Sequence, residues 1–108
     1  MAAATDKIPL QKISDTTIEN CGVNLFVLRL DIVHPLINGN KWFKLKYNLR
    51  EAKKQKKISL LTFGGAFSNH ITATAAAGKE FGFQTVGIIR GEELSRASNP
   101  TLEFAKQN

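Results

Sequence analysis

The sequence contains little that would indicate a secreted, membrane-spanning or repetitive protein. Its 108 residues include a single cysteine, Cys21, so no disulfide can form within the chain. The opening MAAATDK lacks the long apolar core of a signal peptide, and no apolar run approaches the length that crosses a bilayer. No internal repeat or low-complexity tract occurs. We therefore expect a small cytoplasmic domain that has no membrane partner.

Several well-known enzyme motifs are also absent. A nucleophile elbow requires glycine two places after its serine, whereas Ser68 is followed at that place by His70. Neither a Walker phosphate loop nor a dinucleotide-binding GxGxxG sequence is present. Any catalytic site must therefore be built from other residues.

Positive charge is in excess, and it could indicate a nucleic-acid-binding module. The formal net charge is +6, and much of the excess lies between Lys41 and Lys57, including KKQKK at 53–57. Lysines around the C-terminal end of a helix also complement its dipole and solubilise the surface. No nucleic-acid reader motif accompanies the charge. We therefore expect no nucleic-acid partner and keep that role only as a rival hypothesis.

Apolar patterning predicts strands that alternate with helices. The strands are expected at 24–31, 58–63 and 84–90, and the helices at 41–55, 68–81 and 100–108. ISLLTF and QTVGIIR are almost continuously apolar, which is typical of parallel strands buried on both faces. The order predicts an α/β fold, a parallel sheet with flanking helices and right-handed crossovers. Because few such domains end within their third helix, we expect an incomplete N-terminal part of a longer protein.

The helix ends are predicted from capping residues. Asn40 is expected to cap the first helix, and Asn99 followed by Pro100 the last. Gly82 suits a left-handed cap at the end of the second helix. The first helix should also bury an apolar stripe at helical spacing, formed by Trp42, Leu45, Leu49 and Ala52.

The stretch FGGAFSNH at 63–70 is the first candidate site. In parallel sheets, ligands bind beyond the carboxyl ends of the strands, where glycines permit close approach and the next helix offers free N–H groups. Ser68, Asn69 and His70 add a hydroxyl, an amide and an imidazole at that helix start. An anion such as a carboxylate would bind well there. The alternative is that Ser68 or Asn69 only caps the helix and His70 lies at the surface.

The sequence GNKWFK at 39–44 is the second candidate site. It places Lys41 and Lys44 at the start of a helix, where the dipole opposes positive charge. A phosphate would suit Lys44, and the dipole together with desolvation would help Lys41 act as an amine nucleophile toward an aldehyde. The alternative is a pair of exposed lysines.

Taken together, two stretches resemble the 1-aminocyclopropane-1-carboxylate deaminase and D-cysteine desulfhydrase family. They are NGNKWFKLKYNLREAK at 38–53 and LLTFGGAFSNHITATAAAGKEFG at 60–82. The family pattern is Gly-Asn-Lys followed by Arg-Lys-Leu and an aromatic residue, then Gly-Gly-x-x-Ser-Asn and His or Gln at a similar separation. The resemblance covers the middle half of the chain. It implies a pyridoxal-phosphate enzyme of the tryptophan-synthase-β fold type.

The resemblance also implies roles for individual residues. Lys41 matches the lysine that forms the internal aldimine with pyridoxal phosphate, and Lys44 matches the lysine that reaches the phosphate. Asn69 falls where the family binds the hydroxyl of the pyridoxal ring. Ser68 falls where the family holds the substrate carboxylate near the proton transfers, and Asn69 and His70 are expected to share in substrate binding. No metal is implied.

The chain departs from the family pattern at several positions. Trp42 and Phe43 replace a small polar residue and an arginine, which predicts altered packing beside the cofactor. Phe67 stands where glutamine is common. His70 is typical of the desulfhydrase branch and leans away from cyclopropane deamination. Both branches stay open.

Family members are longer and carry a second lobe with most of the phosphate contacts. We therefore expect residues 1–40 to belong to the larger lobe and residues 41–108 to begin the smaller α/β lobe. The leading hypothesis is the N-terminal portion of a pyridoxal-phosphate-dependent lyase or deaminase that acts on a small amino acid and is a homo-oligomer when complete. The 108 residues alone are expected to be inactive. The alternative is a non-catalytic α/β fragment or pseudoenzyme with an anion pocket.

Overall fold

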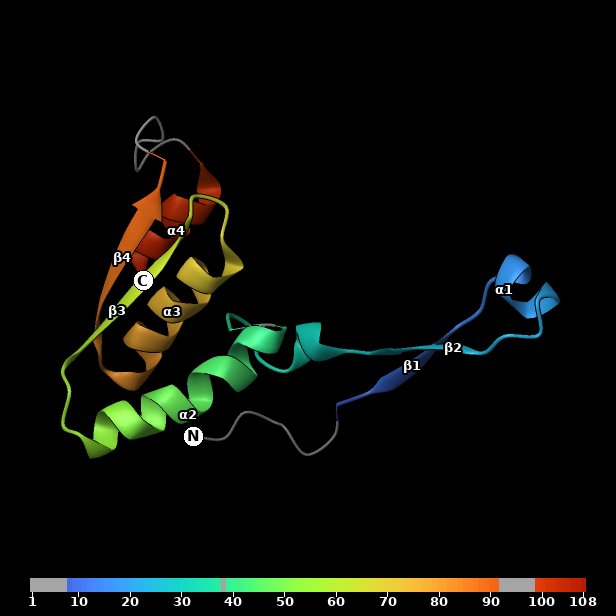
Figure 1. Cartoon of the computed structure of the whole chain (residues 1–108), viewed down its shortest axis with the longest axis horizontal. Helices are drawn as coiled ribbons and strands as arrows, with labels where there is room; N and C mark the ends of the chain where they lie inside the picture. Colours follow the sequence, from blue (N-terminus) through green and yellow to red (C-terminus); the bar gives the residue numbers. More distant parts are fainter. Residues whose placement is uncertain (1–7, 38, 92–98) are drawn as a thin grey trace.

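The computed structural model of the chain describes residues 8–37, 39–91 and 99–108, and it has the expected α/β character. A thin arm, formed by the first strands and helix, extends away from a body that holds the longer helices (Figure 1). In chain order the elements are β1 (Leu10–Ile13), α1 (Thr16–Asn20), β2 (Leu25–Leu28), the 3-10 helix η2 (Leu30–Ile32), α2 (Asn40–Lys54), β3 (Ser59–Gly65), α3 (Asn69–Phe81), β4 (Gln84–Arg90) and α4 (Pro100–Gln107).

The described strands form two separate two-stranded sheets. β3 and β4 are parallel, with Phe63 opposite Ile88, and α3 connects them. The strand expected at 24–31 does not join this sheet, so the prediction of one parallel sheet was wrong for it. That segment forms β2, which pairs antiparallel with β1, Leu28 lying opposite Leu10. Because the short helix α1 reverses the chain between them, the two neighbouring strands satisfy each other's backbone groups.

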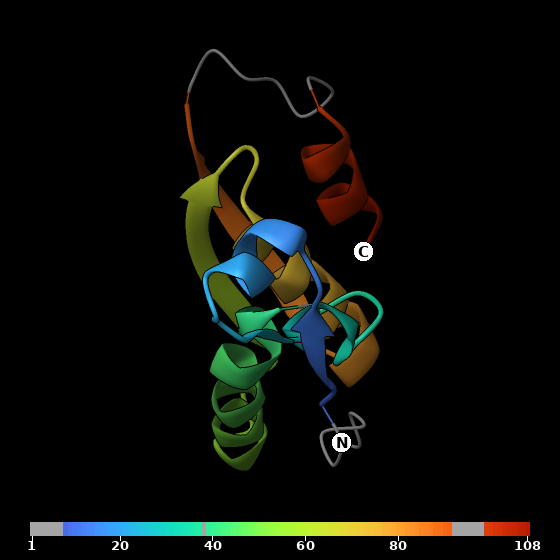
Figure 2. The same cartoon turned by 90° about the vertical axis from the view of Figure 1, so that its right-hand side faces the viewer.

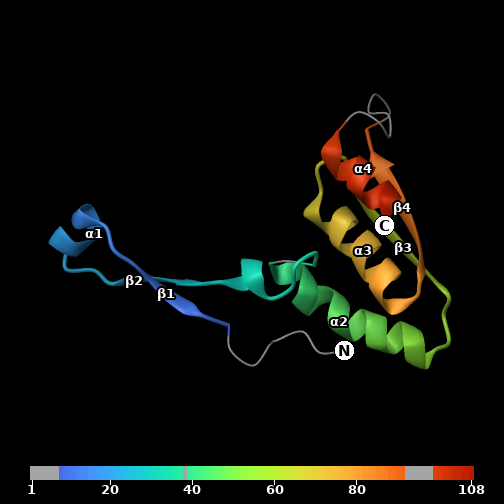
Figure 3. The same ribbon diagram turned by 180° about the vertical axis from the view of Figure 1, so that it is seen from behind.

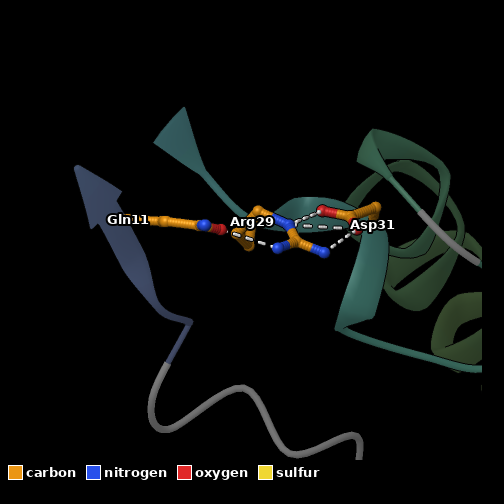
Figure 4. A network of polar contacts seen from close by, with 3 residues as sticks. All are labelled: Gln11, Arg29 and Asp31. Atoms are coloured by element: carbon orange, nitrogen blue, oxygen red, sulfur yellow. Dashed lines mark hydrogen bonds and ion pairs between the residues drawn. The ribbon is translucent and has the colours of Figure 1, made fainter. Parts of the chain in front are cut away.

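The arm is tied to the following turn by Arg29 (Figure 4). Its guanidinium donates to both carboxylate oxygens of Asp31, at 2.8 and 2.7 Å, and to Oε1 of Gln11 on β1 at 2.7 Å. The hydrogen bond from Arg29 lowers the pKa of the Asp31 carboxyl group below its ordinary value. This fork connects β1 with η2 at an exposed position.

The core of the body lies between α2, α3 and the parallel sheet (Figures 2 and 3). Trp42, Leu45 and Leu49 of the predicted α2 stripe are buried, and Ala52 is half-buried. They face the alanine-rich side of α3, whose small side chains let the two helices approach closely. The amphipathic spacing of α2 therefore predicted its inner face correctly.

Gly78 allows α3 to approach β4 closely. A Cβ atom at this position would overlap the methyl group of Thr85 and lie 3.0 Å from the carbonyl oxygen of Phe83. Gly78 is buried within α3. Glycine inside a helix is less favourable than alanine unless packing requires it. Its lack of a side chain thus sets the distance between α3 and the sheet.

The strands β3 and β4 are buried on one face only, contrary to the prediction of burial on both. Thr62 and Ile89 face the helices and are half-buried. The opposite face carries exposed apolar side chains, namely Leu61, Phe63, Val86 and Ile88. In the described part of the chain α3 packs on one face of the sheet and α4 packs on α3 on that same side, which leaves the other face uncovered (Figure 3).

The helix ends agree with the sequence at two of three predicted caps. Asn99 caps α4 by accepting a hydrogen bond from the Leu102 amide at 3.0 Å, and Gly82 ends α3 in the left-handed region at φ 76°. The prediction for Asn40 was wrong, because Gly39 precedes α2 at φ 62° and no side chain caps this helix. No helix within the described ranges is long and apolar enough to span a membrane.

Candidate functional site

The site begins where β3 ends and the chain turns into α3, as the sequence predicted. Gly64 makes the turn possible, because a Cβ there would lie 2.7 Å from Cγ1 of Ile71 and 3.1 Å from Oγ of Ser68. Ser68 precedes α3 in an extended conformation, and its Oγ accepts a hydrogen bond from the amide of His70 at 3.2 Å. The carboxyl end of the strand therefore lies next to the polar start of the helix.

Ser68 caps α3, which supports the capping role that the sequence offered as the alternative to anion binding. We expect Ser68→Ala to lower the free energy of unfolding by about 0.5–2 kcal/mol, the usual cost of a lost N-cap. Urea unfolding of the chain measures this loss. Ser68→Asp, which keeps a capping oxygen, is the matched control and should restore most of the stability; equal losses in both variants would contradict the capping role.

His70 is held by a residue from β3. Its Nε2 lies 2.8 Å from Oγ1 of Thr62, and both side chains are half-buried. The two side chains join the middle of the strand to the first turn of the helix. Sequence reasoning missed Thr62, although its position on β3 could have been inferred from the period of two that places it on the same face as Leu60 and Gly64.

The positive charges of Lys41 and Lys44 act on the ionisation of His70. The pKa of His70 is lowered below its ordinary value, first by burial and then by the positive charges of Lys41 and Lys44. Lys41 is half-buried, and its Nζ donates to Oδ1 of Asn40 at 3.1 Å. α2 packs against α3, so the two candidate sites of the sequence lie on neighbouring helices, and their convergence into one site stays a prediction.

This lowered pKa predicts a pH dependence of stability. His70 has a lower pKa in the folded chain than in the unfolded chain, so the unfolded chain binds more protons just below the ordinary pKa of about 6.5. We expect stability to fall as the pH drops below about 6.5. Thermal unfolding of the wild type and of His70→Gln between pH 8 and 5 measures the effect; an equal fall in both proteins would assign it to other groups.

Asn69 is the first residue of α3 and is exposed. Its carbonyl oxygen accepts a hydrogen bond from Oγ1 of Thr72 at 3.1 Å. Its predicted contact with the hydroxyl of the cofactor ring stays a prediction.

His34 fixes the segment that leads into α2, a role that the sequence did not reveal. Its Nδ1 accepts hydrogen bonds from the amides of Leu36 and Ile37, at 3.2 and 3.1 Å, so a neutral ring carries its proton on Nε2. That nitrogen lies 3.0 Å from a carboxylate oxygen of Glu80 on α3. The ring also stacks on Trp42, with centroids 5.3 Å apart.

Trp42 packs into the core, as its place in the predicted apolar stripe requires, and its effect on packing beside a cofactor stays a prediction. Its side chain is 2% exposed, stacks on His34 and lies tilted against Phe81. Phe43 is half-buried, and the Nζ of Lys46 lies 5.5 Å from the centre of its ring. The unusual residue next to Lys41 therefore supports α2 from within the protein.

The fold defines a class: an α/β chain in which a lysine-bearing helix packs on a second helix whose start is capped by a serine. Comparison with known proteins assigns it more closely. A D-cysteine desulfhydrase of Yersinia pestis is 31% identical over 81 residues, and a bifunctional D-cysteine desulfhydrase/1-aminocyclopropane-1-carboxylate deaminase, mitochondrial, of Arabidopsis thaliana is 33% identical over 81 residues. A Thermotoga maritima protein provisionally named a 1-aminocyclopropane-1-carboxylate deaminase is 39% identical over 86 residues.

These matches cover 75%, 75% and 80% of the chain, respectively. Across the matched segment, the chain belongs to the family of 1-aminocyclopropane-1-carboxylate deaminases and D-cysteine desulfhydrases. It spans 24% of the Yersinia protein, 20% of the Arabidopsis protein and 28% of the Thermotoga protein. No family model matches the chain, and no solved structure matches it significantly.

Proposed function

We propose that the chain is the N-terminal portion of a pyridoxal-phosphate-dependent lyase or deaminase that acts on a small amino acid. The substrate chemistry is that of a D-cysteine desulfhydrase or of a 1-aminocyclopropane-1-carboxylate deaminase. The observation that carries the proposal is the packing of α2, which begins with Asn40 and Lys41, on α3, which begins at Asn69 directly after Ser68, because the two stretches that resemble the family lie on these neighbouring helices. The relatives' names supply the reaction class.

The donor set fits pyridoxal phosphate. An aldehyde requires an amine, and Lys41 offers one that is half-buried and that interacts with a neutral amide oxygen of Asn40 rather than with a carboxylate. A phosphate requires positive charge, which Lys44 provides, and the carboxylate of the substrate requires N–H donors, which the start of α3 offers. Among the described residues, Gly65 leaves open space at the end of β3, because a Cβ there would meet none of their atoms within 4 Å.

Each residue then has a defined task. When bound, pyridoxal phosphate supplies an electron sink for carbanion chemistry on the amino acid. Lys41 holds the cofactor and afterwards carries a proton at Nζ, Lys44 attracts the phosphate, and Asn69 orients the ring. Ser68 and His70, with Asn69, hold the carboxylate of the substrate.

In the complete protein, we assign residues 1–40 to a larger lobe and residues 41–108 to the start of a smaller one. We expect the complete protein to be a homo-oligomer. A location in the cytoplasm also stays a prediction, since one relative is mitochondrial by name.

Reductive trapping tests this function. The chain is mixed with pyridoxal phosphate, its visible spectrum is recorded, the complex is reduced with borohydride and the labelled lysine is identified by peptide mapping. We expect the label mainly on Lys41. A label concentrated on Lys44 or Lys46, or spread evenly over the lysines, would overturn the assignment and favour a non-catalytic fragment with an anion pocket.

A further inference from the structure

We infer that Thr62 is a positioning residue of this site: its hydroxyl donates to Nε2 of His70, so that the neutral imidazole carries its proton on Nδ1 and offers this N–H to an oxyanion. The inference rests on the proposed function, because the oxyanion is the substrate carboxylate or the cofactor phosphate. It adds a residue of β3 to a site otherwise built from α2 and the start of α3.

The hydrogen-bonding capacity of Thr62 favours this direction of the bond. A half-buried hydroxyl group has one proton to donate, and a donor left without an acceptor costs stability. Among the described residues, Nε2 of His70 at 2.8 Å is the acceptor found for Oγ1 of Thr62. If Nε2 instead carried the proton, the Thr62 hydroxyl would accept from it and its own proton would have no acceptor within the described chain.

The surroundings of His70 favour its neutral form. Burial and then the positive charges of Lys41 and Lys44 lower the pKa of the ring, so the neutral imidazole carries one N–H and the hydrogen bond with Thr62 selects the nitrogen that holds it. A neutral ring with its proton on Nδ1 presents a hydrogen-bond donor there, whereas the other tautomer presents a lone pair that repels an oxyanion. Thr62 thus acts on the ligand through His70.

The two histidines of the chain provide an internal comparison. His34 accepts two amide hydrogen bonds at Nδ1, which places its proton on Nε2 when the ring is neutral. The ¹⁵N–¹H correlations of the imidazole rings, recorded on the labelled chain at about pH 8, distinguish the tautomers. We expect His34 and His70 to show opposite tautomers in one spectrum. A proton on Nε2 of His70 in the wild type would overturn the inference.

Variants separate positioning from folding. Thr62→Val is nearly isosteric and removes the hydroxyl, so His70 should lose its preference for the Nδ1 proton, whereas Thr62→Ser should keep it. Thr85→Val is the matched control on β4 and should leave His70 unchanged. An unchanged tautomer in Thr62→Val would contradict the inference, and Thr62→Ala, which also lacks the hydroxyl, takes its place if the valine variant does not fold.

Titration with acetate, inorganic phosphate and pyridoxal phosphate identifies the oxyanion. We expect the Nδ1–H signal to shift with acetate if the carboxylate is the partner, and with phosphate and the cofactor if the phosphate is. Thr62→Val should raise the corresponding dissociation constant about 2- to 10-fold, the effect of one neutral hydrogen bond. A signal that none of the three anions moves would refute the ligand role. Failure of Lys41 to take the label would refute the proposed function and leave the tautomer result standing.

Discussion

Lys41→Ala should eliminate the borohydride-trapped pyridoxal label from α2. The aldehyde of the cofactor requires an amine, and Lys41 is the half-buried lysine that the family motif places at the helix start. Lys44→Ala should keep the label on Lys41 but weaken cofactor binding by about 1–3 kcal/mol, the cost of a lost hydrogen bond to a charged group. Absorbance spectra and peptide mapping measure both effects.

Lys46 offers a control on the same helix. Its Nζ lies 4.8 Å from the centre of the Tyr47 ring. Lys46 is predicted to contact neither the aldehyde nor the phosphate of the cofactor. Lys46→Ala should therefore change neither the position nor the amount of the label. If Lys41→Ala leaves the labelled yield intact, the amine assigned to the cofactor is wrong.

Gly78→Ala should destabilise the chain by about 1–3 kcal/mol, the usual cost of overpacking a core. The added methyl group would collide with Thr85 and approach the carbonyl oxygen of Phe83, so α3 would have to move away from β4. The higher helix propensity of alanine offsets less than about 1 kcal/mol of this cost. The free energy of unfolding in urea measures the difference.

Gly65→Ala is the matched control, because a methyl group there meets nothing within 4 Å. It should change the free energy of unfolding by less than about 0.5 kcal/mol, as surface substitutions usually do. Equal stabilities of Gly78→Ala and the wild type would mean that α3 does not lie this close to the sheet.

Local signals predicted the body of the protein well. The apolar spacing of α2, the cap at Asn99 and the left-handed Gly82 all depend on residues within one or two turns of each other. The same holds for Ser68, whose capping of α3 was one of two roles proposed for it. Such interactions can be inferred from a single sequence because both partners lie close together along the chain.

Contacts between residues that lie far apart in the sequence could not be predicted in this way. The pairing of β2 with β1 depends on the reversal at α1, and the contact between Thr62 and His70 depends on how β3 meets α3. The burial of both sheet faces was predicted from composition alone, but burial depends on which elements are present to cover a face. The effect of the Lys41 charge on the pKa of His70 likewise depends on the packing of α2 on α3.

The stacking of Trp42 on His34 determines the rotation of α2 about its own axis. Successive helical residues are about 100° apart, so the indole, fixed in the core one residue after Lys41, determines the direction in which that lysine leaves the backbone. Lys44, three residues later, leaves on nearly the same side. A larger or smaller residue at position 42 would therefore shift, relative to the start of α3, the backbone positions from which both lysine side chains leave the helix.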